Sequence, residues 1–449
     1  MKHSLWCTAL AFLAGMAGAP AQAATILVAA GETAFNPGNG SCSLREAIRN
    51  GDTESETSGG DCTPGSVGSN TIVLAANSIY LIGDRDTEHR DDQVNGLPEV
   101  HGDLIIEGNG ATISRDPALF SGSACSGGGA KFRIFYISAL GSLALKNLTL
   151  SNGCADVLGV EGAGGALFNR GFLSLDGVTL TANQALRSGG AIHNDGSLTV
   201  TRSTISSNAV LATEAGGGGI VNRGAMQISQ STISGNTGAG AGGGIDTGVG
   251  NATLSNSTVS GNVAAGNGGG VFSRSPSTAL VNTTVAANRG TNGSAAGAGS
   301  GVFGIAGTLQ LTNTLLAQQA NGTNCSGASG GGNNLSDDNS CPTATNAAAL
   351  IGPLANNGGP TFTHALLVGS PAINTASAAA CSAAPQNGVD QRGQPRPQGA
   401  GCDIGAFEFE QRSAAGSGAA PIPTLGALGM WLLMGLMALA AMVTLRRGR

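Results

Sequence analysis

One phrase recurs six times between Gly164 and Gln318: a glycine doublet, an aliphatic residue, a polar pair, and then a threonine-aliphatic-small segment that usually ends in asparagine. The aliphatic positions, spaced 25, 28, 25, 26 and 31 residues apart, are Leu167, Ile192, Ile220, Ile245, Val271 and Val302. The threonine segments cover residues 179–183, 204–208, 232–236, 258–262, 284–288 and 314–318. A unit this short cannot bury its own apolar side chains and must stack on copies of itself. The repeat therefore predicts a solenoid.

Each repeat contains three short extended pieces, separated by corners rich in Gly, Asp, Asn or Arg. Within residues 189–215 these pieces are 191–194, 197–201 and 203–207, and each alternates apolar with polar residues. Three strands per turn predict an all-β fold, a right-handed parallel β-helix with strands about 4.8 Å apart. Less regular turns around residues 104–106, 134–137 and 143–150 bring the expected total to about nine coils.

The composition suits this fold better than a conventional globular core. Only 4% of the residues are aromatic and 11% charged, whereas 75 of 449 are glycine. A β-helix has a narrow interior that stacked rows of small and aliphatic side chains can fill. A disordered glycine-rich chain is excluded for residues 70–320, because the glycines stand in register with aliphatic residues.

Both ends of the chain carry targeting signals. Residues 1–23 combine a basic start, an apolar stretch and an Ala-Gln-Ala cleavage signature, as in a secretory signal peptide. Residues 425–445 carry no charge and would span about 31 Å as a helix, which matches the core of a bilayer. Basic residues follow at once, so we expect a single transmembrane helix with the body of the protein outside. Residues 412–421 form a small-residue linker before this tail.

Eight cysteines remain after signal cleavage, and an even count in an exported chain favours disulfides. Pairing of sequence neighbours is the most economical choice: Cys42 with Cys62, Cys125 with Cys154, Cys325 with Cys341, and Cys381 with Cys402. Free buried thiols are the alternative. No cysteine pair has zinc-finger spacing, so we expect neither a structural metal nor a cofactor.

The charge balance argues against nucleic acid as a partner. Of 21 basic residues, Lys2 and the tail residues Arg446, Arg447 and Arg449 lie outside the exported part, which leaves 17 basic against 27 acidic residues, or −10. No basic stripe is present that would follow a phosphate backbone.

The C-terminal tail resembles the IPTL-CTERM sorting signal of Gram-negative bacteria. The match consists of Ile422, Pro423, Thr424 and Leu425, the apolar segment 425–445, and the final arginines Arg446, Arg447 and Arg449. The resemblance implies recognition and cleavage by an exosortase-type transpeptidase, and delivery of the body to the cell surface. A plain single-span membrane anchor is the alternative.

Residues 42–48, Cys-Ser-Leu-Arg-Glu-Ala-Ile, resemble the CSLREA motif that opens many secreted β-helix proteins. Physically they form a capping box, in which Ser43 accepts a backbone N–H near Glu46 and Glu46 bonds back to the cap. The predicted short helix would cover the open first coil within an N-terminal cap, residues 24–70, ahead of the β-helix at 71–320. A catalytic role for Arg45 and Glu46 is the alternative.

Residues 353–373, 390–393 and 403–408 look like a choice-of-anchor Q domain, a surface-protein module that precedes anchoring tails. The resemblance implies a C-terminal cap over residues 321–411 and no chemistry. We expect Asp390, Arg392 and Asp403 to form an ion-pair network that closes the last coil.

One outward row of side chains is a candidate polysaccharide-binding site. Because side chains alternate along a strand, register stacks six outward residues: Phe168, His193, Val221, Asp246, Phe272 and Phe303. Beside them stand Arg170, Asp195, Arg223, Gly248 and Arg274. Aromatic rings could stack on sugars while the charged groups bond hydroxyls. The alternative is that loops cover the phenylalanines and that Arg170, Asp195 and Arg223 pair along the ladder.

The inward row reads as structural, and catalytic carboxylates are scarce. Asn169, Asn194, Asn222, Thr247 and Ser273 predict a polar ladder whose side chains bond one another and the backbone. A polysaccharide lyase or glycoside hydrolase would need carboxylates clustered on adjacent coils. The acidic pairs at 91–92 and 337–338 lie in polar loops instead. We therefore expect an exported surface protein that acts as a structural or binding module, possessing no catalytic residues, with a polysaccharide-active enzyme as the alternative.

Overall fold

The computed structural model describes residues 23–86, 94–157, 162–212, 216–291, 299–305, 307–384 and 387–410. The predicted signal peptide, apart from Ala23, lies outside these residues, as do the linker and the sorting tail with its predicted transmembrane helix. Within the described ranges, no helix is long and apolar enough to cross a membrane. All of the described residues except Glu410 belong to one compact unit, Met1–Phe409.

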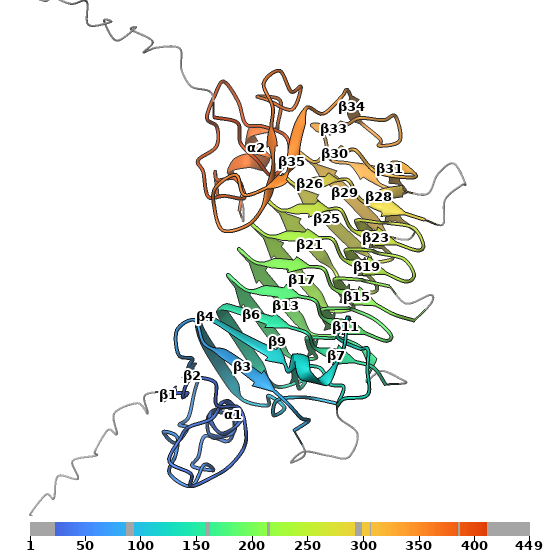
Figure 1. Ribbon diagram of the computed structural model, residues 1–449. Coiled ribbons are helices and arrows are strands. Elements are labelled where there is room, and N and C mark those ends of the chain that lie inside the picture. The colour runs from blue at the N-terminus through green and yellow to red at the C-terminus, as the bar shows by residue number, and fades with distance from the viewer. Residues whose placement is uncertain are drawn as a thin grey trace, which may run out of the picture. The chain divides into compact units, whose positions relative to one another are not determined.

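The chain winds into a parallel β-helix built from three parallel sheets (Figure 1). The eight-stranded sheet contains β5 (Phe135–Ile137), β8 (Leu167–Asn169), β12 (Ile192–Asn194), β16 (Ile220–Asn222), β20 (Ile245–Thr247), β24 (Val271–Ser273), β28 (Gly299–Gly304) and β31 (Thr323–Ser326). The six-stranded sheet contains β7 (Cys154–Ala155), β11 (Gln184–Ala185), β15 (Ala209–Val210), β19 (Thr237–Gly238), β23 (Val263–Ala264) and β27 (Arg289–Gly290).

The 20-stranded sheet includes two strands from most turns. Its members are β1 (Thr25–Leu27), β2 (Asn70–Val73), β3 (Ile79–Ile82), β4 (Asp103–Arg115), β6 (Ser142–Ser151), β9 (Phe172–Asp176), β10 (Thr179–Thr181), β13 (Ser197–Thr201), β14 (Thr204–Ser206), β17 (Ala225–Ser229), β18 (Thr232–Ser234), β21 (Ala252–Ser255), β22 (Thr258–Ser260), β25 (Ser277–Val281), β26 (Thr284–Ala286), β29 (Thr308–Thr312), β30 (Leu315–Ala317), β32 (Ser329–Gly330), β33 (Asn334–Ser336) and β34 (Ala344–Asn346). Outside these sheets lie α1 (Leu44–Thr53), the 3-10 helix Pro117–Leu119, the antiparallel pair β35 (Ile351–Ala355) and β36 (Thr363–Leu366), and α2 (Ala378–Ser382).

The parallel β-helix is confirmed, but the expected number of strands per turn and of coils is wrong. A regular turn such as β12 to β15 has four strands, because a two-residue strand follows each of the first five threonine segments. Two residues are too few to show alternation, so the sequence pattern missed them. Among the described residues, the sheet of two-residue strands has six members, which gives six turns with a strand in every sheet rather than nine. In the earlier turns β4 and β6 instead run as single strands of 13 and 10 residues.

Strand register agrees with the repeat except at its last copy. The aliphatic positions pair from Leu167 through Val302 and are fully buried. The threonines pair from Thr179 to Thr284, but Thr284 then pairs with Leu315 rather than with Thr314. The sixth segment is therefore displaced by one residue, and the side chain of Gln319, not Gln318, bonds Asn288.

Two polar ladders run through the interior. The expected one is confirmed: Asn169 Nδ2 donates to Asn194 Oδ1, and Asn194 Nδ2 donates to Asn222 Oδ1, each at 2.7 Å. Thr247 and Ser273 both lie within hydrogen-bond distance of Thr278 Oγ1. The second ladder joins the asparagines that end each repeat, namely Asn183, Asn208, Asn236, Asn262 and Asn288, at 2.9–3.0 Å. These bonds satisfy buried amides that would otherwise cost free energy.

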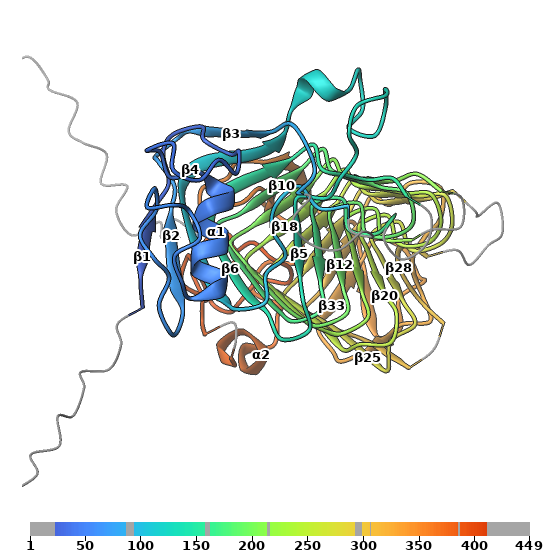
Figure 2. The ribbon, with the colours of Figure 1, turned by 90° about the horizontal axis from the view of Figure 1, so that it is seen from below.

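The capping box at the start of α1 is confirmed. Ser43 Oγ accepts from the Glu46 backbone N–H at 3.3 Å, and Glu46 Oε2 accepts from the Ser43 N–H at 2.9 Å. The helix packs beside β1, β2 and β4 (Figure 2), and Leu44, Ala47 and Ile48 are fully buried there. Arg45 donates to the Gly96 carbonyl and pairs with Asp84 at 2.7 Å. Arg45 and Glu46 are therefore engaged in structural contacts.

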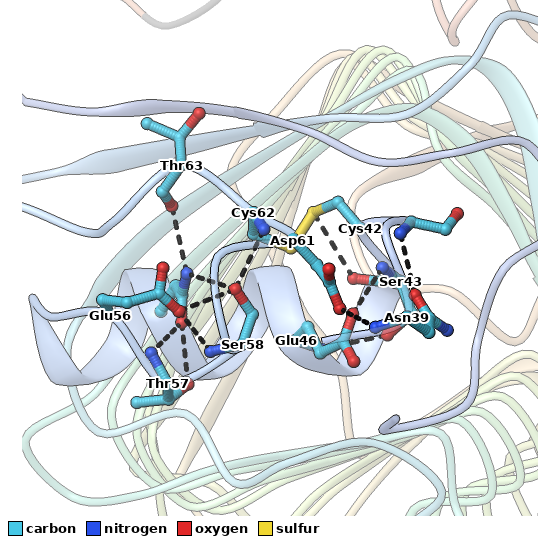
Figure 3. Close-up of a disulfide and its surroundings, with 12 residues drawn as sticks. Asn39, Cys42, Ser43, Glu46, Glu56, Thr57, Ser58, Asp61, Cys62 and Thr63 are labelled. Atoms are coloured by element: carbon cyan, nitrogen blue, oxygen red, sulfur yellow. Dashed lines mark hydrogen bonds between the residues drawn. A yellow bond between two sulfur atoms is a disulfide. The ribbon is translucent and has the colours of Figure 1, made fainter. Parts of the chain in front are cut away.

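Three of the four expected disulfides are present and one is not. The bonded pairs are Cys42–Cys62, which joins the segments on either side of α1 (Figure 3), Cys125–Cys154 and Cys325–Cys341. Cys381 and Cys402 are instead buried free thiols in hydrogen-bond contact with each other. Burial raises the pKa of both thiols.

The C-terminal segment lies along the side of the β-helix and does not close its last coil, contrary to expectation. Gln391 Nε2 donates to Thr232 Oγ1 at 2.9 Å, and Thr258 Oγ1 donates to Gln391 Oε1 at 2.6 Å. Both threonines belong to middle turns. The expected ion pair between Arg392 and Asp390 is present at 2.9 Å. Asp403, however, accepts backbone N–H groups, including that of Asn374.

Candidate functional site

The eight-stranded sheet carries two neighbouring outward rows, as the repeat predicts. The first, called here the covered row, consists of Phe168, His193, Val221, Asp246, Phe272 and Phe303, which are direct register partners. The second, the charged row, consists of Arg170, Asp195, Arg223, Gly248 and Arg274. From Asp195 on, each backbone N–H of the charged row donates to the turn before it, at 2.7–2.8 Å. Both rows therefore have one residue per turn.

The covered row is buried except at Phe303, which is partly exposed, so the expected aromatic platform is wrong. Phe168 is 1% exposed and Phe272 is 7% exposed. At Val221, Asp246 and Phe272, a glycine of the turn that precedes the strand lies directly over the outward side chain. A Cβ atom on Gly268 would stand 2.8 Å from Phe272 Cβ, and one on Gly217 would overlap Val221 Cγ2. The part of the alternative in which loops cover the phenylalanines is therefore confirmed.

His193 is held from three sides beneath this cover. Its Nδ1 lies 2.8 Å from Ser188 Oγ, its Nε2 lies 3.0 Å from Asp195 Oδ1, and its ring stacks on Phe168 at 4.6 Å. Burial lowers the pKa of His193, although Asp195 opposes that shift. The hydrogen bond from His193 lowers the pKa of Asp195. At neutral pH the imidazole is thus neutral and its Nε2–H donates to the Asp195 carboxylate, while Nδ1 accepts from Ser188.

Asp246 is buried two turns further along. It is 3% exposed, and Arg274 Nη2 donates to its Oδ2 at 2.8 Å. Its Oδ1 has no hydrogen-bond partner. Burial raises the pKa of Asp246, and Arg274 opposes this shift. The glycine at 216 makes room for this carboxyl group, because a Cβ there would overlap Asp246 Oδ2.

The charged row is exposed, and two of its arginines have no acidic partner. Arg170, Asp195, Arg223 and Arg274 are all exposed residues. Arg170 leans over the Phe168 ring at 5.5 Å, and Arg274 leans over the Phe272 ring at 5.2 Å. Asp195 pairs with His193 rather than with an arginine, so the expected Arg170–Asp195–Arg223 pairing is wrong. Among the described residues, no carboxylate pairs with Arg170 or Arg223.

The described residues do not assemble a hydrolytic pair of carboxylates on this face. Asp246 and Asp195 stand two turns apart, about 10 Å at strand spacing, and Asp246 is covered. Asp337 and Asp338 accept the N–H groups of Gln318 and Asn324, so they stabilise a turn. Residues 91–92 lie outside the described ranges. Within those ranges, no group of three or more His, Cys, Asp or Glu residues could hold a metal ion.

Comparisons with known proteins give only one structural likeness to report. No family model matches the chain, and no curated protein matches it significantly. Among solved structures, it resembles the crystal structure of pectate lyase Pel9A, with a TM-score of 0.48 and 15% sequence identity. The alignment covers 86% of this chain and 96% of the lyase chain.

Proposed function

We propose that this protein is an exported β-helix that acts at the cell surface as a non-catalytic module for binding glycans. The observation that carries the proposal is the charged row, in which Arg170 and Arg223 are exposed and, among the described residues, form no ion pair with a carboxylate. A guanidinium group offers several N–H donors in a fixed plane, which suits carboxylates and sugar hydroxyls. The three disulfides are typical of proteins exported to an oxidising compartment.

A polysaccharide-active enzyme is the weaker candidate. Asp246 has a raised pKa, which is suitable for a general acid, but it is 3% exposed and already bonded by Arg274. His193 could act as a general base by accepting the hydroxyl proton of Ser188. Its ring, however, is buried and stacks on Phe168. Neither group faces a second catalytic residue across an open site.

The purified body, residues 24–411, tests the binding function directly. We expect it to bind one or more glycans on an immobilised panel of neutral and acidic polysaccharides, and to release no reducing ends or unsaturated products from them. The panel should be run with and without added Ca²⁺. Depolymerisation of any polysaccharide would favour the enzyme, and absence of all binding would contradict the module.

Sorting by the C-terminal tail is a separate prediction. In a host with an exosortase-type enzyme, mass spectrometry of the mature C-terminus should find a chain that ends near Thr424 and lacks Arg446, Arg447 and Arg449. In a strain without that enzyme, the same residues should remain and the protein should stay with the membrane fraction. If the tail were intact in both strains, it would be a simple membrane anchor and the sorting prediction would be wrong.

A further inference from the structure

Arginines alternate with non-basic residues along the charged row. From one turn to the next it reads Arg170, Asp195, Arg223, Gly248 and Arg274, so that a cation stands on every second turn. On the two turns between these arginines, the row has an anion, Asp195, and a residue without a side chain, Gly248. An unpatterned basic patch would not show this alternation.

The spacing of the cations follows from the fold. Neighbouring parallel strands lie about 4.8 Å apart, so successive arginines are about 10 Å apart and the outer two are about 19 Å apart. Ladder hydrogen bonds fix this spacing: the N–H of Arg223 donates to Asn194 O at 2.7 Å, and that of Arg274 donates to Thr247 O at 2.8 Å. Stacking on Phe168 and Phe272 restricts the side chains of Arg170 and Arg274 further. The cations are therefore preorganised for a linear polyanion whose charges have the same interval.

Asp195 disfavours a negatively charged group of the ligand on the turn between Arg170 and Arg223. Its carboxylate is ionised at neutral pH, because the His193 hydrogen bond lowers its pKa. A carboxylate of the ligand on this turn would meet that like charge, which costs affinity, whereas a hydroxyl or amide N–H could donate to Asp195. The neighbouring turn, at Gly248, offers no cation to attract a charge either.

We propose that the charged row binds a linear acidic polysaccharide in which charged and neutral sugars alternate, with one carboxylate per disaccharide. An extended disaccharide spans about two strand spacings, so successive carboxylates would meet Arg170, Arg223 and the N–H groups of Arg274 that Asp246 does not hold. A polymer with a carboxylate on every sugar would place charges opposite Asp195. This inference rests on the proposed glycan-binding function and narrows it to one class of ligand.

Two hexasaccharides of equal length separate this inference from simple charge attraction. The first is a hyaluronan hexasaccharide, with three carboxylates on alternate sugars. The second is hexagalacturonate, with six carboxylates. By calorimetry in low salt, we expect the protein to bind the hyaluronan oligomer more tightly, although it carries half the charge. Tighter or equal binding of hexagalacturonate would overturn the inference.

Substitutions in the row test each part of the argument. Arg170→Gln with Arg223→Gln should weaken hyaluronan binding about tenfold, since two charge-assisted contacts are lost. Neither residue forms an ion pair within the described part of the chain, so the fold should not change. The matched control is Arg202→Gln, an exposed arginine on another corner, paired with Asp176. It should change binding less than twofold, and an equal loss in the control would contradict the assignment of the site.

Asp195→Asn tests the selectivity, because an asparagine oxygen can still accept from His193. This variant should bind hexagalacturonate about fivefold more tightly, with less effect on the hyaluronan oligomer. An unchanged ratio of the two affinities would overturn the role of Asp195. If neither oligomer bound but other glycans did, only this inference would fail. If no glycan bound at all, the proposed function would fail with it.

Discussion

Asn236→Ala is expected to lower the free energy of unfolding by about 3 kcal/mol, because it removes the middle of a buried hydrogen-bond ladder. The Asn236 Oδ1 atom accepts from the backbone N–H and from Nδ2 of Asn208, each at 3.0 Å. Its Nδ2 donates to Ile205 O at 2.9 Å. Alanine would leave the Asn208 N–H buried without a partner and would remove the side-chain hydrogen bond to the Ile205 carbonyl. Each such group costs about 1–3 kcal/mol.

Denaturant unfolding followed by circular dichroism measures this loss. The matched control is Ser234→Ala, two residues earlier in the same turn, at a position that is not fully buried. That substitution should change stability by less than about 0.5 kcal/mol. If Asn236→Ala lowered the free energy of unfolding as little as Ser234→Ala, the asparagine ladder would contribute little to stability. The aliphatic rows alone would then hold the turns together.

The architecture could be predicted because one repeat specifies both the stacking and the register. Ile192 and its five equivalents occupy buried positions that recur with each turn, and a one-residue slip would expose the whole set. The prediction failed where the pattern was weak. The two-residue strands have no periodicity, and the sixth copy shifts by one residue at Leu315. The second ladder was visible in the sequence as the asparagine that ends each repeat, but its hydrogen bonds were not anticipated.

The candidate site was predicted less well, because alternation gives the direction of a side chain and not what covers it. Phe168 and Phe272 do point outward, yet Phe168 is buried between Tyr136 and His193, and the glycine turn at Gly268 lies over Phe272. The pairing of Asp195 was not predictable either: it bonds His193, two residues earlier, and interacts with Arg170 and Arg223 only electrostatically, without an ion pair. Register alone could not distinguish these two arrangements.

The corner beside the charged row should tolerate no side chain at Gly224. A Cβ atom there would overlap the carbonyl oxygen of Gly196 on the preceding turn and stand 2.8 Å from Asp195 O. Both are backbone atoms, so a whole turn would have to move. We expect Gly224→Ala to destabilise the protein by about 3 kcal/mol or more, through forced separation of two hydrogen-bonded turns.

Gly248→Ala, one turn further along the row, is the matched control. Its Cβ would meet nothing closer than 3.4 Å, where it contacts Arg223 Cγ and Asn222 O. Its backbone lies outside the left-handed region, so alanine should be neutral or slightly stabilising. Thermal unfolding of both variants measures the difference, and the hyaluronan titration shows whether the shift at Gly224 also separates Asp195 from Arg223. Equal melting temperatures would mean that the corner can relax, and the charged row would then lose the fixed spacing on which its selectivity depends.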